Sequence, residues 1–279
     1  MKTLLLTCLA MIAFAANSVL CRLALSQGGI DPTSFTVVRL LSGAVVLGLI
    51  FRFNRGKTTS PSRGSWLAAA MLFLYAISFS FAYVSLTTGT GALILFGAVQ
   101  ISMIVLTLVS GQELKPLELT GIIIAFCGLV YLVLPGVTAP SVSGFLLMAL
   151  AGIAWGIYTL RGRGTQNPLA DTTFNFIRSA PLVIIPALVA FPGMHSSGTG
   201  MLLAALSGGV TSGIGYAIWY TALRGLTATQ AAVVQLSVPI IAAFGGVLFI
   251  AEQITLRLAL STVLTLGGIL MVILSKEKN

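Results

Sequence analysis

Two arginines lie inside apolar stretches, where a charge is costly, and they stand at matching places in the two halves of the chain. Arg39 and Arg178 each lie about six residues into an apolar segment, roughly 9 Å along a helix axis. Ionisable side chains at such a depth in a membrane are functional candidates. Two plainer interpretations stay open, because a long arginine can reach the lipid headgroups or belong to a structural ion pair.

Two glutamates are the expected partners of these arginines. Under the membrane orientation derived below, Glu252 lies on the outer side with Arg39 and Arg22, and Glu113 lies on the inner side with Arg178. We favour gate-like or structural pairs, Arg39 with Glu252 and Arg178 with Glu113, over contact with a substrate. Matched arginines at both ends of a repeat suit symmetric closure.

Aromatic and amide side chains within the apolar segments are candidates for a substrate cavity. A ligand site needs a few polar and aromatic groups that point inward, and several of these residues share one helix face by their spacing. Alternatively, Trp and Tyr form interfacial belts and amides link helices. Both interpretations are open for Trp219 and Tyr220, near a predicted cytoplasmic end. The candidate substrate-binding residues are Asn17, Tyr75, Ser78, Gln100, Trp155, Tyr158, Tyr216, Trp219, Tyr220 and Gln235.

Groups typical of catalysis and of metal binding are scarce. The one histidine, His195, lies in a loop, and all six acidic residues lie in loops or at helix ends. We therefore expect no catalytic residues, no metal and no cofactor. Proton-coupled carriers usually keep a carboxylate or histidine inside the membrane, so we expect no dedicated proton relay. The net charge of +9 sits mostly in short loops, without a basic groove, which argues against nucleic acid as a partner.

The composition is that of a protein embedded in a membrane along its whole length. The chain is 57% hydrophobic and only 8% charged, and its mean hydropathy is +1.04. The first run resembles a signal peptide, but it continues to Leu25 and is long enough to span, so we expect no cleavage. Ten apolar segments are predicted to span, near residues 3–25, 33–52, 65–87, 89–110, 116–134, 142–161, 172–191, 200–223, 227–250 and 255–275.

The sequence repeats itself once, with a period of half its length. Charged residues are scarce, so identical charged residues at one gap-free offset of 139 indicate an internal repeat. We predict two five-helix units, residues 1–138 and 139–279. Because five is odd, the second unit enters the membrane from the opposite side, which gives the inverted repeats of many secondary transporters. The matched pairs include Arg22 with Arg161, Phe35 with Phe174, Arg39 with Arg178, Glu113 with Glu252, and Gly128 with Gly267.

Loop charges predict the orientation of the bundle. With the amino terminus in the cytoplasm, eleven Lys and Arg residues are cytoplasmic, and only Arg22 and Arg257 face outward. Cytoplasmic loops of membrane proteins carry an excess of basic residues. We therefore expect a multi-pass protein of the inner (plasma) membrane with both termini in the cytoplasm.

Two local motifs accompany the ten-helix inverted repeat. A Phe-x-x-x-Arg pattern begins the second helix of each unit, at 35–39 and 174–178, and a glutamate precedes each fifth helix. Together these features resemble the EamA-type family of the drug/metabolite transporter superfamily, over essentially the whole chain. The proline usual in the ninth helix of that family is Pro239, but its repeat mate in the fourth helix is Gln100, so we expect the two halves to bend differently.

The resemblance implies a secondary transporter, and export of an amino acid or similar small metabolite is the favoured task. Such a carrier would work by alternating access, one five-helix unit rocking against the other around a central site. The rival from another class is a non-transporting membrane sensor or assembly factor, and an enzyme is not expected. The expected partners are a small-molecule substrate and the lipid bilayer.

Overall fold

The protein is a bundle of helices, seen in a computed structural model that describes residues 2–53, 63–109, 116–134, 136, 139–162, 165–226 and 228–277. Over these residues, nine helical segments are long and apolar enough to cross a membrane, and the shorter apolar helix Thr88–Ser102 adds a tenth. The prediction of an all-helical membrane protein with ten spans is thus confirmed.

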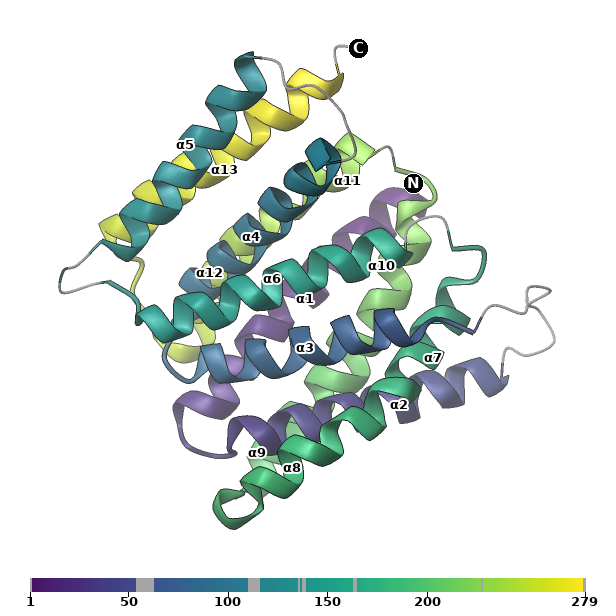
Figure 1. Ribbon diagram of the computed structural model, residues 1–279. Coiled ribbons are helices and arrows are strands. Elements are labelled where there is room, and N and C mark those ends of the chain that lie inside the picture. Colours follow the sequence, from purple (N-terminus) through teal and green to yellow (C-terminus); the bar gives the residue numbers. More distant parts are fainter. Residues whose placement is uncertain are drawn as a thin grey trace.

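Each half of the chain supplies five of these spans (Figure 1). The first five are α1 (Lys2–Ser26), α2 (Pro32–Phe53), α3 (Trp66–Tyr83), α4 (Thr88–Val109) and α5 (Pro116–Val133). The sixth is α6 (Val142–Gly162). The seventh joins α7 (Pro168–Ser179), η2 (Ala180–Val183), α8 (Ile184–Ala190) and η3 (Phe191–Gly193). The eighth joins α9 (Gly198–Leu206), η4 (Ser207–Ile214) and α10 (Gly215–Leu223). The last two are α11 (Ala228–Gln235) with α12 (Ser237–Ile250), and α13 (Leu256–Glu277).

The packing of these spans follows the sequence repeat. Span α3 packs along α6. The repeat mate of α3 is the α9–η4–α10 span, which packs along α1, the repeat mate of α6. In the same way α4 packs on α6, while α12 packs on α1. The pairs α5 with α13 and α2 with α7 join equivalent spans of the two units. These main contacts are therefore kept when the two units are exchanged. Both termini lie at the same end of the bundle (Figure 1).

Prolines explain why the second unit is more broken than the first. Pro239 has no backbone N–H to donate to the carbonyl of Gln235, and the ninth span is interrupted at Leu236, between α11 and α12. The fourth span carries Gln100 at the matching place, and α4 runs without a break. Pro181 likewise lies in the 3₁₀ turn η2 that separates α7 from α8. The two halves bend differently, as the sequence predicted.

A close contact between α2 and η4 brings the two units together near the centre. A Cβ atom added at Gly208 would overlap the carbonyl oxygen of Arg39 and the hydroxyl of Ser42, and one added at Gly209 would lie 2.9 Å from Val46. Glycine therefore allows the backbones to approach, as in other membrane helix pairs. This contact fixes where Arg39 leaves the backbone of α2.

We expect Gly208→Ala to destabilise the protein, because the added methyl group must push α2 away from η4. Overpacking of a tight contact costs about 1–3 kcal/mol, so the melting temperature of the purified protein should fall by several degrees. Gly48→Ala on α2 is the matched control, since nothing lies within 4 Å of a Cβ built there. Equal melting temperatures for the two variants would contradict the close approach.

Candidate functional site

The side chain of Arg39 is buried at the centre of the bundle. It is only 1% exposed, and its guanidinium lies over the rings of Tyr75 and Phe79, with Cζ 5.0 and 4.9 Å from the two ring centres. Such cation–π contacts are strongest where the cation is desolvated. The arginine therefore points into the protein and does not reach toward the headgroups.

Neutral hydroxyl groups from both units hold this guanidinium. Its Nε donates to Ser212 Oγ at 3.0 Å, and its Nη2 donates to the hydroxyls of Tyr75 and Tyr216, each at 3.0 Å. The two tyrosine hydroxyls are also bonded to each other, Tyr216 donating to Tyr75 at 3.2 Å. Ser212 and Tyr216 belong to the second unit, whereas Arg39 and Tyr75 belong to the first, so the network crosses the interface between the repeats.

Asn17 on α1 extends the network and links it to three hydroxyls of η4. Its Nδ2 donates to Tyr75 Oη at 3.1 Å. Its Oδ1 accepts from Ser207 at 2.7 Å and from Thr211 and Ser212 at 3.3 Å each. A single amide thus accepts from three successive polar side chains of one segment.

The π-helical geometry of η4 presents these hydroxyls together. Residues Ser207–Ile214 form a π-helix of eight residues between α9 and α10. The wider π turn is rare and occurs frequently at functional sites. Ser207, Thr211 and Ser212 were not among the predicted site residues. Their sequence signal, a polar run with glycines inside an apolar span, is also that of an ordinary packing face.

Aromatic rings surround the polar centre. Trp155 on α6 contacts Tyr75, Tyr158 and Tyr216, with ring centres 5.1, 5.4 and 4.6 Å away. The ring centre of Phe14 on α1 lies 5.7–5.8 Å from those of Trp155, Tyr216 and Trp219. The aromatic–polar cluster, as we call it, comprises Phe14, Asn17, Arg39, Tyr75, Phe79, Trp155, Tyr158, Ser207, Thr211, Ser212, Tyr216, Trp219 and Tyr220.

The structure brings most of the predicted cavity residues together, though packed against one another. Asn17, Tyr75, Trp155, Tyr158, Tyr216, Trp219 and Tyr220 all belong to the cluster and are buried. Gln100 and Gln235 are bonded to carbonyls of α11 and not to the cluster. Gln100 Nε2 donates to the carbonyl of Ala232 at 3.4 Å, and Gln235 Nε2 donates to that of Ala231 at 3.1 Å. Ser78 is buried on α3. The centre is therefore closed in this conformation.

One of the two predicted glutamates has a different arginine as its partner in this conformation. In this conformation Glu252 is paired with Arg22, 3.1 Å from Nε to Oε1, and not with Arg39. The reason is packing: the α12–α13 turn that carries Glu252 adjoins α1 and α4, whereas α2 faces η4 and α7. Arg178 donates to the carbonyl of Arg63 and lies over the ring of Trp66. Its predicted partner, Glu113, lies outside the described residues.

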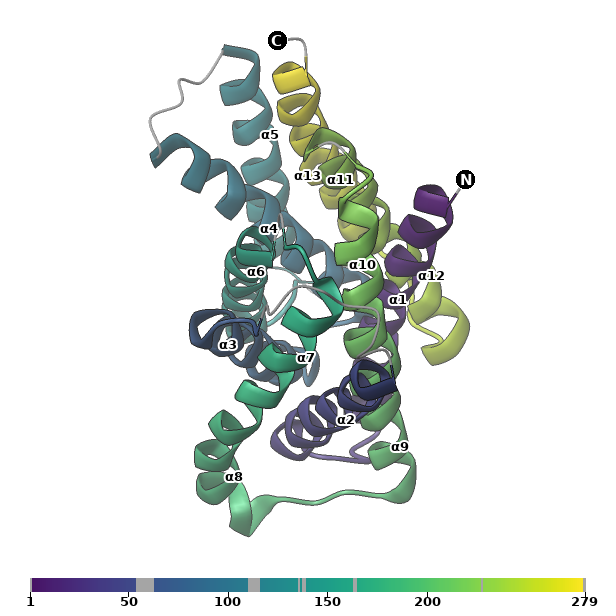
Figure 2. The same cartoon turned by 90° about the vertical axis from the view of Figure 1, so that its right-hand side faces the viewer.

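Polar contacts join the two units at the predicted outer end of the bundle. Glu252 accepts from Arg22 and from the backbone N–H of Thr88, which begins α4. Beneath α2, where the chain runs from α8 to α9 (Figure 2), Asp31 accepts from the backbone N–H of His195 at 2.9 Å. Burial acts to raise the pKa of Asp31, but hydrogen bonds from Ser34, His195 and Thr33 outweigh it and hold that pKa below its usual value.

Polar contacts also join the two units at the opposite, predicted cytoplasmic end. Asp171 and Asn175 on α7 accept from the backbone N–H groups of Gly64 and Ser65, at 2.9 and 3.0 Å. These two residues precede α3 of the first unit, so both ends of the interface carry polar contacts between the units.

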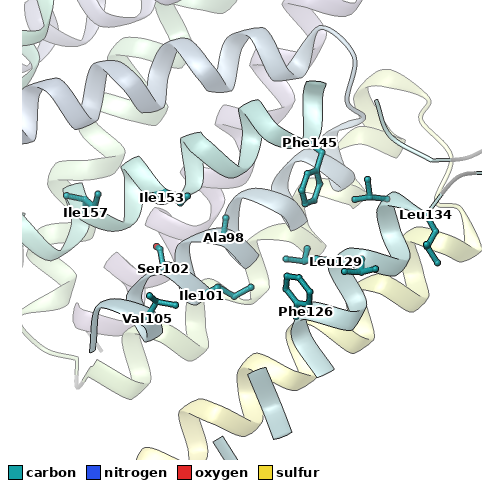
Figure 3. A pocket seen from close by; sticks show the side chains of 12 residues that line it. Ala98, Ile101, Ser102, Val105, Phe126, Leu129, Leu134, Phe145, Ile153 and Ile157 are labelled. Carbon is teal, nitrogen blue, oxygen red and sulfur yellow. The ribbon is translucent and has the colours of Figure 1, made fainter. Parts of the chain in front are cut away.

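A separate apolar groove of about 680 Å³ lies between α4, α5 and α6. Figure 3 shows its lining, which is aliphatic and aromatic apart from Ser102. Several lining side chains, among them Phe126 and Ile153, are exposed on the outside of the bundle. None of the lining residues belongs to the aromatic–polar cluster, so this groove suits lipid chains better than a polar substrate.

Comparison with known proteins gives the family. The family model described as "EamA-like transporter family" matches residues 1–134 and again 142–274. An uncharacterized protein of Pseudomonas aeruginosa is 50% identical over 98% of this chain and 94% of its own length. An uncharacterized transporter of Archaeoglobus fulgidus is 27% identical, with 96% of each chain covered.

A more distant relative and a solved structure are also similar to this chain. The uncharacterized transporter YoaV of Bacillus subtilis is 20% identical over 87% of each chain. A solved crystal structure superimposes with a TM-score of 0.65 at 20% identity, covering 97% of each chain, which supports the fold alone. The two family matches fill nearly the whole length, and the chain therefore belongs to the EamA-like transporter family.

Proposed function

We propose that this transporter exports amino acids or similar small metabolites across the inner (plasma) membrane by alternating access. The observation that carries the proposal is the aromatic–polar cluster, which is assembled from both repeats at the centre of the bundle. Substrate sites of repeat-built transporters lie near the midplane between the repeats. Asn17, Tyr75, Trp155 and Tyr216 are the proposed substrate contacts.

We infer that the polar contacts between the units at the two ends act as closures, in a carrier caught between its open states. The outer contacts join Arg22 to Glu252 and Asp31 to His195, and the inner contacts join Gly64 and Ser65 to α7. Each pair bridges the two repeats. We infer that rocking breaks one set while it keeps the other, so that the cluster opens to one side at a time.

The Arg22–Glu252 pair should stabilise the outer closure. Hydrogen bonds to charged groups contribute about 1.5–3 kcal/mol, so Arg22→Gln and Glu252→Gln should each lower the melting temperature. The double variant should lose less than the sum, because either change alone already breaks the pair. Arg257→Gln is the control at the same end of the bundle, since Arg257 bonds to carbonyls of α5 and its following turn. Additive losses for Arg22 and Glu252 would argue against the pair.

The proposed orientation places both termini in the cytoplasm. A single cysteine at Ala139, introduced after Cys8, Cys21 and Cys127 are replaced by Ala, should react with a membrane-impermeant maleimide added outside intact cells. A cysteine at Arg63, in the predicted inner loop, should react only after the membrane is opened. Labelling of residue 139 only from the cytoplasmic side would contradict the proposed orientation.

Purified protein in liposomes should exchange its substrate without a proton gradient. All six acidic residues lie at helix ends or in loops, so we expect no proton relay through the centre. The measurement is counterflow of a panel of radiolabelled amino acids into preloaded vesicles, with and without an imposed pH gradient. Empty liposomes are the control. Concentrative uptake that needs the gradient and is lost in Glu252→Gln would contradict this expectation, and no exchange of any compound would count against transport of this class.

A further inference from the structure

One nitrogen of the buried guanidinium is left without a hydrogen bond. Arg39 Nη1 is buried and has no partner among the described residues, whereas Nε and Nη2 together make three bonds. An unpaired donor in a low-dielectric interior costs about 1–3 kcal/mol, and more when the group is charged. The protein therefore holds a charged donor in the core without fully satisfying it.

No carboxylate among the described residues is bonded to this group to balance its charge. The groups bonded to Arg39 are a serine and two tyrosines, all neutral. The carboxylates of Asp31 and Glu252 are engaged in the outer closure, and Asp171 binds the inner loop. A buried cation is strongly stabilised by an anion that it can contact directly. A ligand with a negative charge would supply both the missing hydrogen bond and the missing charge.

The chemistry of the surroundings narrows that anion to a carboxylate on a small, mostly apolar molecule. A single guanidinium matches a carboxylate in charge and in planar geometry, whereas a multivalent phosphate calls for several cations. The rings of Phe14, Trp155 and Trp219 stand next to the polar centre and offer apolar contact. The buried Nε1 of Trp219, which also has no partner among the described residues, can donate one further hydrogen bond.

The repeat mate of Arg39 does not share this environment. Arg178 binds the carbonyl of Arg63 at the inner end. At the gap-free offset of 139, Tyr75 and Tyr216 fall on Ile214 and Ile77. Over the part of the chain that the structure describes, the set of hydroxyls around Arg39 therefore has no counterpart around Arg178. Arg178 is thus a natural control for any substitution of Arg39.

We propose that Arg39 Nη1 anchors the carboxylate of the transported substrate, so that the protein selects small monocarboxylates, amino acids included, with an apolar remainder. Arg39 then contacts the substrate directly, and Tyr75, Tyr216 and Ser212 are positioning residues that hold its guanidinium. This inference rests on the proposed function, because it assigns the substrate class of the same site.

Binding of matched acids and amides tests the proposal. Phenylacetate and phenylacetamide have nearly the same shape, but only the first carries a carboxylate. Tryptophan fluorescence of purified protein reports on the site, since two of the three tryptophans, Trp155 and Trp219, belong to the cluster. We expect wild type to bind the acid roughly ten- to a hundred-fold more tightly than the amide, the range of a charge-assisted hydrogen bond. Chloride at equal ionic strength should not reproduce the signal.

Variants then assign the preference to one arginine. Arg39→Gln should reduce the acid-to-amide ratio to near one, Arg39→Lys should keep part of it, and Arg178→Gln should leave the wild-type ratio unchanged. A wild type that binds both probes equally, binds neither, or responds equally to chloride overturns the proposal, whether or not Arg39→Gln folds. An unchanged ratio in folded Arg39→Gln overturns it as well.

Transport separates this inference from the function on which it rests. Counterflow of amino acids together with equal binding of acid and amide would support the proposed transport and contradict the carboxylate anchor. The opposite result is acid-selective binding that is lost in Arg39→Gln, with no exchange of any compound in vesicles. That result would support the anchor and contradict the proposed transport.

Discussion

A guanidinium that is sealed inside a membrane bundle must find its hydrogen-bond partners within the protein, because neither water nor lipid can supply them. Nε and Nη2 of Arg39 find such partners where α2 and η4 nearly touch. Gly208 permits the approach, Ser212 comes within 3.0 Å of Nε, and the π turn leads into α10, which carries Tyr216. The burial of this charge thus depends on the contact between the two repeats at the level of the site.

The scaffold is symmetric, but the chemistry placed on it is not. The main helix contacts are preserved when the two units are exchanged, and a matched arginine lies in the second span of each unit. Only one of these arginines is buried among hydroxyls, however. Its repeat mate, Arg178, donates to a loop carbonyl and lies over the ring of Trp66 at the inner end. Duplicated helices can therefore keep their packing roles while one copy of a charged residue acquires a separate polar environment.

Periodicity, repeat and charge were enough to predict ten spans and most of the cluster, because tyrosine, tryptophan and asparagine are conspicuous inside apolar runs. The partner of Arg39 was beyond reach, since it depends on which face of α2 meets η4. The π turn of Ser207–Ile214 was also hidden, because an extra residue per turn leaves no clear mark in a short apolar segment. The third and fourth spans were predicted at 65–87 and 89–110, whereas α3 ends at Tyr83 and α4 begins at Thr88.

The proposed mechanism needs contacts that open and a contact that persists, and the two kinds differ in their physics. The end closures rest on a few polar bonds, such as Arg22 with Glu252, which water can replace when an end opens. In contrast, α5 and α13 lie side by side along one edge of the bundle (Figure 1), where a Cβ at Gly268 would come within 2.5 Å of the carbonyl of Gly121. Close van der Waals packing at small residues is one of the forces that hold helices together in a membrane. The α5–α13 pair is therefore the contact best suited to persist while the rest of the interface rocks.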